Sequence, residues 1–276
     1  MVVLLRAIRR NSNMTQLLRS GCLLLLIVLT GAIFTGCGED EPEEPKVNRA
    51  LVFDGVDDYI DLGNIYDDVQ LPVTVSAWVW LDPTVEAGLI PILDSQDGLD
   101  MYNGFNILSS NYSVVGAQYG DGKGTNNSIY RRAKSANIDP IMGGWVNLTA
   151  VIKGATEMDL YLDGVNVGGS YTGESNSAMN SNSPTEVAKV GYLYQNGTVF
   201  RFKGKMDELK IWDRSLTVDE VQDVIYKKLD ASENGLVGYW DFNESEGSTV
   251  FDRSKNHFNG VIKGDAQREL SEVPIE

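Results

Sequence analysis

From residue 46 onward, apolar and polar positions alternate in short runs, which is the pattern of β-strands. Residues 73–81 place Val, Ala and Leu at every second position, with Thr, Ser and two Trp between them, so both faces of this strand are expected to be covered. Residues 145–153 alternate in the same way. Clusters of Gly, Asn, Asp and Ser separate the runs, and the whole pattern predicts an all-β fold.

The remaining strands follow from the same alternation. Asp163-Gly164 between two alternating runs predicts a tight hairpin that joins residues 158–162 to 165–167. Strands at this spacing are typical of a two-sheet antiparallel sandwich or jelly roll. Further strands are expected at residues 50–53, 59–62, 105–108, 187–194, 199–202, 206–212 and 236–242.

One helix interrupts the strands, near residues 217–229. Thr217 and Glu220 have the spacing of a capping box, in which each side chain satisfies a free backbone N–H of the first turn. An apolar stripe follows, which predicts a helix packed on the sandwich, and two lysines lie where the helix dipole favours cations. The stripe is Val221, Val224, Ile225 and Leu229, and the lysines are Lys227 and Lys228.

Residues 1–36 differ from the rest because they contain four Arg and no Asp or Glu. Residues 21–36 are apolar or small, and the run is shorter than the roughly 20 apolar residues that a spanning helix needs. This pattern favours a signal peptide over a transmembrane anchor. Met14 would serve as a start as well as Met1, because residues 14–19 already form a basic leader.

The end of this segment, Thr35-Gly36-Cys37, resembles the lipobox of bacterial lipoproteins. The resemblance implies cleavage before Cys37 and a lipid on that cysteine. Gly38 implies an outer-membrane destination, and the acidic run at residues 39–45 is similar to the signal that exports Bacteroidota lipoproteins to the cell surface. The same composition is typical of a disordered tether at residues 37–46, and a periplasm-facing protein is the alternative.

Without residues 1–36 the chain keeps 19 basic and 39 acidic side chains, a formal charge of −20. This charge disfavours nucleic acid as a partner and favours cations. Cys22 leaves with the signal peptide and Cys37 is expected to be acylated, so no disulfide is expected in the folded part.

Five segments occur in the order found in laminin-G-like, concanavalin A-type domains, and the resemblance extends over residues 47–263. They are LVFDGVDDYI (51–60), VTVSAW (73–78), WVNLT (145–149), LYLDG (160–164) and GKMDELKIW (204–212). The resemblance implies a concanavalin A-like two-sheet jelly roll for carbohydrate or protein recognition, often with a structural calcium ion. It predicts one domain at residues 47–266 and a C-terminal tail at 267–276.

One segment departs from the family order. GLVGYWDFNE (235–244) resembles a stretch that often lies before the first strand, whereas here it closes the chain. It either completes an edge of the same sandwich or begins a second domain. About 40 residues are too few to bury a core, which favours the first interpretation.

The family includes glycoside hydrolases, so the resemblance also raises the question of catalytic carboxylates. The nearest match to the paired carboxylates of laminarinase-like enzymes is Glu157-Met-Asp159, in which Leu162 stands where the second Glu belongs. His257 is the one histidine, which disfavours a Ser-His-Asp hydrolase or a zinc site. The sequence therefore favours a protein that is not an enzyme.

Calcium is the expected cofactor, because it binds carboxylates and backbone carbonyls. By alternation Asp207 shares a face with Leu209 and Ile211 and points to the covered side, where a bare carboxylate is costly. The resemblance implies that Asp207 joins the turn that contains Asp54 and Asp57. An Asp that is hydrogen-bonded within a turn is the alternative.

Glycan binding usually depends on aromatic rings that stack on sugars. The tryptophans lie in predicted strands and are assigned to the core, whereas the tyrosines in or near loops are better candidates. These are Tyr102, Tyr112, Tyr119, Tyr192 and Tyr194. The resulting hypothesis is a surface-displayed, lipid-anchored carbohydrate-binding module that captures a polysaccharide, with a protein-binding or structural cell-envelope module as the alternative and a glycoside hydrolase or lyase as a third.

Overall fold

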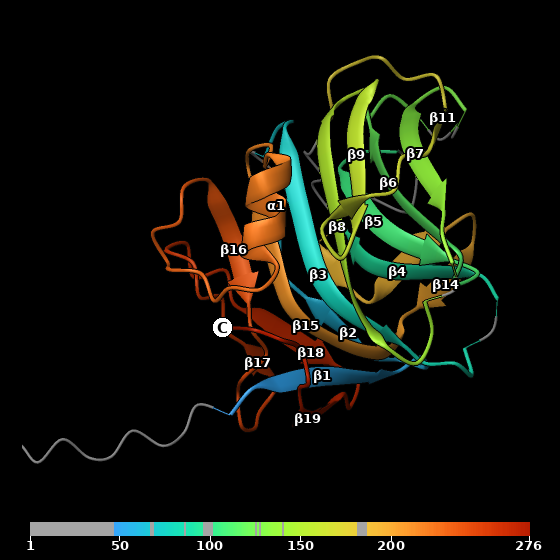
Figure 1. Cartoon of the computed structure of the whole chain (residues 1–276). Coiled ribbons are helices and arrows are strands. Elements are labelled where there is room, and N and C mark those ends of the chain that lie inside the picture. The colour runs from blue at the N-terminus through green and yellow to red at the C-terminus, as the bar shows by residue number, and fades with distance from the viewer. Residues whose placement is uncertain are drawn as a thin grey trace, which may run out of the picture. The chain divides into compact units, whose positions relative to one another are not determined.

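The computed structural model describes residues 47–276, apart from 67–68, 86, 96–101, 125, 127, 140 and 181–186. In this part the strands form two antiparallel sheets that pack face to face, as Figure 1 shows, and one helix lies on the outside of the first sheet. The predicted all-β sandwich is thereby confirmed. The predicted signal peptide, Cys37 and the tether lie outside the described residues.

Sheet A runs in the order β10-β9-β8-β3-β15-β1-β19, and β16 also pairs with β15. β1 pairs with the first half of β15, and β16 pairs with its second half. The segment from residue 235 therefore completes the same sandwich. The strands are β1 (Arg49–Asp54), β3 (Val73–Leu81), β8 (Trp145–Gly154), β9 (Glu157–Leu162), β10 (Val165–Asn166), β15 (Lys203–Trp212), β16 (Leu236–Trp240) and β19 (Gln267–Leu270).

Sheet B runs in the order β11-β7-β6-β5-β4-β12-β2-β18-β17, and β13 pairs with β14 as a separate hairpin. The strands of sheet B are β2 (Tyr59–Asp61), β4 (Leu89–Asp94), β5 (Phe105–Ser110), β6 (Val114–Gly120), β7 (Arg131–Asn137), β11 (Ser170–Thr172), β12 (Lys189–Val190), β17 (Thr249–Val250) and β18 (Gly260–Lys263). The hairpin strands are β13 (Tyr192–Gln195) and β14 (Thr198–Arg201).

The main core lies between the sheets, where alternate residues of β3 such as Val75 and Val79 meet residues of sheet B such as Ile107 and Val115. A second cluster fills the space between sheet A and α1 (Val218–Val224) and includes Trp212 and the buried helix residues. The predicted covering of both faces of β3 is explained by these two layers.

The helix begins as predicted, with the reciprocal capping box of Thr217 and Glu220, but it ends earlier than residue 229. The last turn contains no basic residue. Two side chains of sheet A replace the predicted lysines at this end: Lys210 Nζ donates to the carbonyl of Val224 at 3.0 Å, and Trp78 Nε1 donates to that of Ile225 at 2.7 Å. The cation that stabilises the helix end therefore comes from the sheet.

Two predicted boundaries are corrected. The strand expected at residues 187–194 is divided at Gly191, which has a positive φ of 77° and packs against the ring of Phe53, so a side chain would not fit. Residues 267–270 form β19 on the edge of sheet A and are not a free tail. Gln-Arg-Glu-Leu lacks apolar alternation because an edge strand is only partly buried, so the sequence pattern missed it.

Among the described residues, no helix is long and apolar enough to cross a membrane.

Candidate functional site

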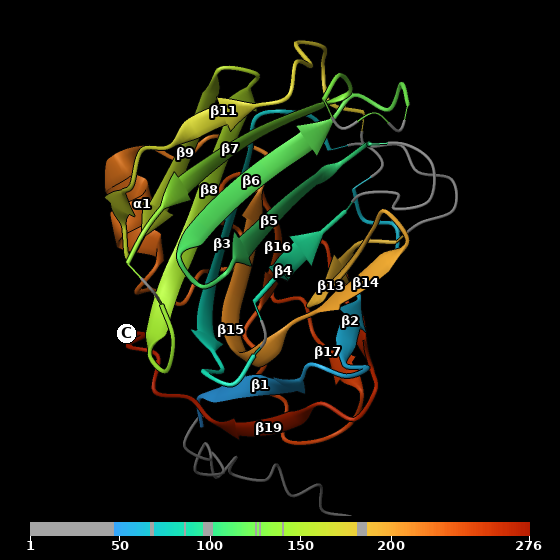
Figure 2. The same ribbon diagram turned by 90° about the vertical axis from the view of Figure 1, so that its right-hand side faces the viewer.

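The outer face of sheet B carries a groove. Residues that alternate toward the core, such as Phe105 and Ile107, leave Asn106 and Leu108 on the outer side of β5. The helix packs against sheet A, on the other side of the sandwich, whereas Figure 2 looks onto β4 to β7, with the hairpin β13–β14 beside β4. The groove has a volume of about 210 Å³.

A row of aligned residues crosses this face from strand to strand. Asp94 of β4 lies opposite Asn106 of β5, Asn106 opposite Gln118 of β6, and Gln118 opposite Ala133 of β7. Thr172 of β11 continues the row beyond Ala133. One register thus places carboxylate, amide and hydroxyl groups side by side across five strands.

The polar side chains of the row are held by hydrogen bonds. Asn106 Nδ2 lies 3.4 Å from Asp94 Oδ1, and Arg131 Nη1 donates to Gln118 Oε1 at 2.7 Å. Asp94, Asn106 and Gln118 are at most 5% exposed. Burial also lowers the pKa of Arg131. Fixed amides and a guanidinium are groups that orient a polar ligand without first having to be ordered.

Small residues make the groove hollow. Gly116 and Ala133 line its floor, Ser110 and Ser135 lie along it, and Gln195 of the β13–β14 hairpin contributes to the wall. A ligand ring can approach the strand backbone closely where no large side chain stands.

Beyond β4, the same face carries a cluster of tyrosines and cations, which we call the arginine–tyrosine cluster: Tyr59, Lys189, Tyr192 and Arg201. Ile60 and Val190 point into the core, so their neighbours Tyr59 and Lys189 lie on the outer side. Arg201 Cζ lies 4.3 Å from the ring centre of Tyr192 and 5.0 Å from that of Tyr59. Lys189 Nζ lies 5.0 Å from the Tyr192 ring centre.

The five candidate tyrosines do not form one site. Tyr119 is 1% exposed within the core and donates to the carbonyl of Ser177, so the prediction that it binds a ligand is wrong. Tyr119 and Gln118 are neighbours on β6, and alternation turns Gln118 rather than Tyr119 outward. Tyr112 is packed against the core in a turn with positive φ. Tyr192 belongs to the arginine–tyrosine cluster and Tyr194 follows it on β13, whereas Tyr102 precedes β5.

Asp207 is fully buried and lies beside residues from the first and the last segments of the described chain, Asn48 and Ser271. Its Oδ2 accepts from Ser271 Oγ at 2.5 Å and lies 3.4 Å from Asn48 Nδ2, while its Oδ1 accepts from the backbone N–H of Glu208. Burial raises the pKa of Asp207 to about 8, and Glu208 and Asp241 add to this increase. A buried carboxylate with acidic neighbours favours a bound cation.

The side-chain amide of Asn48 shows whether the groups around Asp207 fit a bound cation. Asn48 Oδ1 is buried and has no hydrogen-bond partner among the described residues. If the amide is turned over, its oxygen lies at the nitrogen position, 3.4 Å from Asp207 Oδ2. Two oxygens bound at right angles to one Ca²⁺ are separated by about 3.4 Å, so the pair fits a calcium shell.

The predicted orientation of Asp207 and its predicted partners are both corrected. A bulge follows Asp207, with Glu208 at φ 53°, so Met206 and Leu209 both enter the core and Asp207 does not share their face. Asp54 pairs with Lys203, four residues from Asp207, which is about 13 Å along the strand. Asp207 and Asp54 are therefore too far apart to bind the same ion.

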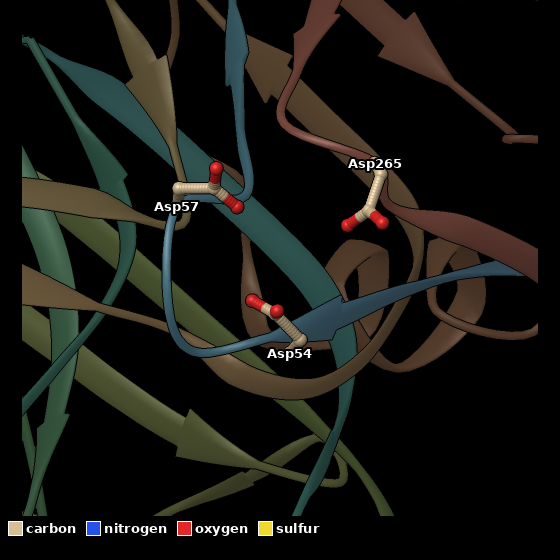
Figure 3. A group of neighbouring side chains, drawn as sticks. All are labelled: Asp54, Asp57 and Asp265. Atoms are coloured by element: carbon tan, nitrogen blue, oxygen red, sulfur yellow. The ribbon is translucent and has the colours of Figure 1, made fainter.

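Asp54 and Asp57 instead meet Asp265, and we call these three residues the acidic triad. One carboxylate oxygen of each lies within 4.8 Å of the others, and all three are exposed. Figure 3 shows Asp54 at the end of β1, Asp57 in the following turn and Asp265 in the segment before β19, with their carboxylates converging. This spacing equals about two calcium–oxygen bonds, so the acidic triad could bind a metal ion.

The buried side chain of Asp58 holds the backbone of two members of the acidic triad in place. It is 1% exposed, and its carboxylate accepts from the backbone N–H of Asp54 at 2.9 Å and of Asp265 at 2.8 Å. Burial raises the pKa of Asp58, and the charges of Asp54 and Asp265 add to the increase. Gly264, at φ 85°, passes so close to Asp58 that a Cβ would collide with it. Asp265 could not be predicted as a member of this group, because it lies about 200 residues away from its partners along the chain.

Asp159 and His257, which the sequence raised in connection with catalysis, are not close partners of a second catalytic group in the described part of the chain. Asp159 accepts from Lys153 Nζ at 2.9 Å and from Asn166 Nδ2 at 3.2 Å on the exposed side of β9. His257 lies exposed in a turn with positive φ.

Residues 54–222 match the Laminin_G_3 family, described as the concanavalin A-like lectin/glucanases superfamily, and the chain belongs to this family. No curated protein matches the sequence.

Among solved structures, the chain is similar to "a putative carbohydrate binding protein" from Bacteroides ovatus ATCC 8483, with 16% identity and a TM-score of 0.60. That match covers 83% of this chain and 62% of the other, so the chain spans less than two thirds of that structure. It is also similar to the Ruminococcus gnavus IT-sialidase CBM40 bound to α2,3-sialyllactose, with 14% identity, a TM-score of 0.49 and coverage of 63% and 95%. At 16% identity, the likeness to the Bacteroides ovatus structure shows the fold alone.

Proposed function

We propose that the protein is a carbohydrate-binding module that holds a polysaccharide in the groove on the outer face of sheet B and does not cleave it. The observation that carries this proposal is the hollow floor of Gly116 and Ala133 beside the fixed side chains of Asn106, Gln118 and Arg131. The Bacteroides ovatus structure of the same fold, described as "a putative carbohydrate binding protein", supports it. Binding of any glycan on an array would be the first test.

A groove-filling variant tests the location. Ala133→Leu places a larger side chain on the floor of the groove, and we expect it to weaken glycan binding at least about tenfold without lowering the melting temperature much, because the added atoms enter open space. Binding is measured by titration calorimetry with a glycan selected on the array.

The matched control is Ala231→Leu, the same change at an exposed position outside the groove, which should bind like the unchanged protein. If Ala133→Leu binds as tightly as Ala231→Leu, the glycan does not lie in the groove.

We further propose that the protein is anchored to the outer membrane through a lipid on Cys37 and displayed at the cell surface. The lipobox-like Thr35-Gly36-Cys37 and the acidic run after it support this. The Cys37→Ala variant is expected to lose all label from a clickable fatty acid and to leave the membrane fraction, since one acidic tether has no other affinity for lipid.

Protease shaving of intact cells then separates surface display from a periplasm-facing anchor. Labelling of Cys37→Ala at the level of the unchanged protein would contradict the anchor, and full protection from the protease would contradict display.

We also propose that calcium is a structural cofactor, bound by Asp207 together with Asn48 and Ser271. The buried carboxylate, the partnerless Asn48 oxygen and the hydroxyl of Ser271 support this assignment. Calcium would supply the positive charge that Asp207 lacks and would join the start of β1 to the end of β19.

A further inference from the structure

Arg201 of the arginine–tyrosine cluster makes no ion pair with a described residue, although acidic residues outnumber basic ones by 39 to 23. Its Nε and Nη1 are buried and have no hydrogen-bond partner in the described part of the chain. Its guanidinium carbon lies over two tyrosine rings, which offer no oxygen or nitrogen acceptor to these two donors. Unmet donors of this kind cost free energy, and an anionic acceptor would satisfy them.

Arg131, on the other side of the groove, also has a buried donor without a partner among the described residues. Its Nη1 is used by Gln118, but its Nε has no partner among the described residues. Tyr59 lies on β2 and Arg131 on β7, five strands apart in sheet B, which is about 24 Å at the usual strand spacing. A ligand that reaches both ends of this face is an oligosaccharide and not a single sugar.

We propose that the glycan bound on this face is acidic, and that Arg201 receives the carboxylate of a uronic-acid-type sugar. This inference rests on the proposed glycan-binding function. The guanidinium offers charged N–H donors to the oxygens of a carboxylate, and the rings of Tyr59 and Tyr192 hold it in place. Arg131 receives a second acidic unit of the same chain, beyond the row of amides.

Binding to matched pairs of ligands tests the proposal. Oligosaccharides of polygalacturonate, alginate and hyaluronate are titrated in their free-acid form and as methyl esters, which keep the sugar rings but remove the charge. We expect at least one acid form to bind about tenfold or more tightly than its ester. Arg201→Gln is expected to remove that preference, and Arg201→Lys to restore part of it, because lysine keeps the charge but loses the paired N–H groups.

The controls separate this inference from the function on which it rests. Lys255→Gln removes one charge at an exposed position outside the cluster and should keep the preference. Equal binding of acid and ester, or an unchanged preference in Arg201→Gln, would overturn the acidic assignment and leave glycan binding intact. Preference for a sulfated glycan over all three acids would overturn the choice of carboxylate. Failure to bind any acidic or neutral glycan would overturn both proposals.

Discussion

Lys210→Met is expected to lower the free energy of unfolding by about 3–5 kcal/mol, the usual cost of removing one partner of a buried ion pair. Lys210 Nζ lies 2.9 Å from Glu208 Oε2 and also donates to the carbonyl of Lys227 at 2.7 Å. Both side chains are at most 1% exposed. The variant leaves the Glu208 carboxylate with Tyr239 as its main donor and leaves the helix end without its cation.

Thermal unfolding measures the effect, and a melting temperature about 10 °C lower is expected for a domain of this size. The control is Lys228→Met, which removes the same charge from an exposed position and should change the melting temperature little. The double variant Glu208→Gln/Lys210→Met should recover much of the loss, because neither position of the pair then carries an unpaired buried charge. A melting temperature of Lys210→Met equal to that of Lys228→Met would show that the pair does not hold the helix.

Alternation predicted the central strands of sheet A well because they are buried between the core on one side and the second apolar cluster on the other. The strand expected at residues 73–81 is β3 to the residue, and the expected hairpin at Asp163-Gly164 joins β9 to β10. β3 and β9 each carry an unbroken apolar set that has to face the core, and a shift of one residue would expose the whole set.

Two strands under the groove, β6 and β7, were missed for a related reason, whereas β5 was predicted at residues 105–108. β6 and β7 contain Gly116, Gln118 and Ala133 on the side away from the core, so small and polar residues interrupt the apolar signal. A strand whose outer face carries small and polar residues has the composition of a loop. The absence of a strong pattern in residues 114–120 and 131–137 was therefore itself a mark of the candidate site.

The cation sites could not be assembled from the sequence because local irregularities and distant contacts determine them. The bulge after Asp207 reverses the face that strict alternation assigns. Asp265 reaches Asp54 only through the pairing of β18 with β2 and of β19 with β1. The sequence predicted acidic residues as candidate ligands, but not which carboxylates lie close together.

Calcium is expected to raise the melting temperature of the unchanged protein by about 5–10 °C at a concentration about 100 times the dissociation constant, which corresponds to about 2.7 kcal/mol. Asp207→Asn is expected to abolish this shift, because the carboxylate that binds the ion is lost. The same variant should be more stable than the unchanged protein in chelator, since asparagine avoids the free-energy cost of keeping Asp207 buried either charged or with a proton taken up above its ordinary pKa. Differential scanning calorimetry with and without chelator measures both effects.

Asp265→Asn is the matched control, because it makes the same chemical change in the exposed acidic triad. If calcium binds at Asp207, Asp265→Asn keeps the shift and gains little stability in chelator, since its carboxylate is already solvated. The reverse result, with the shift lost in Asp265→Asn and kept in Asp207→Asn, would move the structural ion to the acidic triad. A melting temperature of the unchanged protein that ignores both calcium and chelator would exclude a structural ion at either place, and the charge of Asp207 would then have to be removed by the proton that its raised pKa allows it to hold.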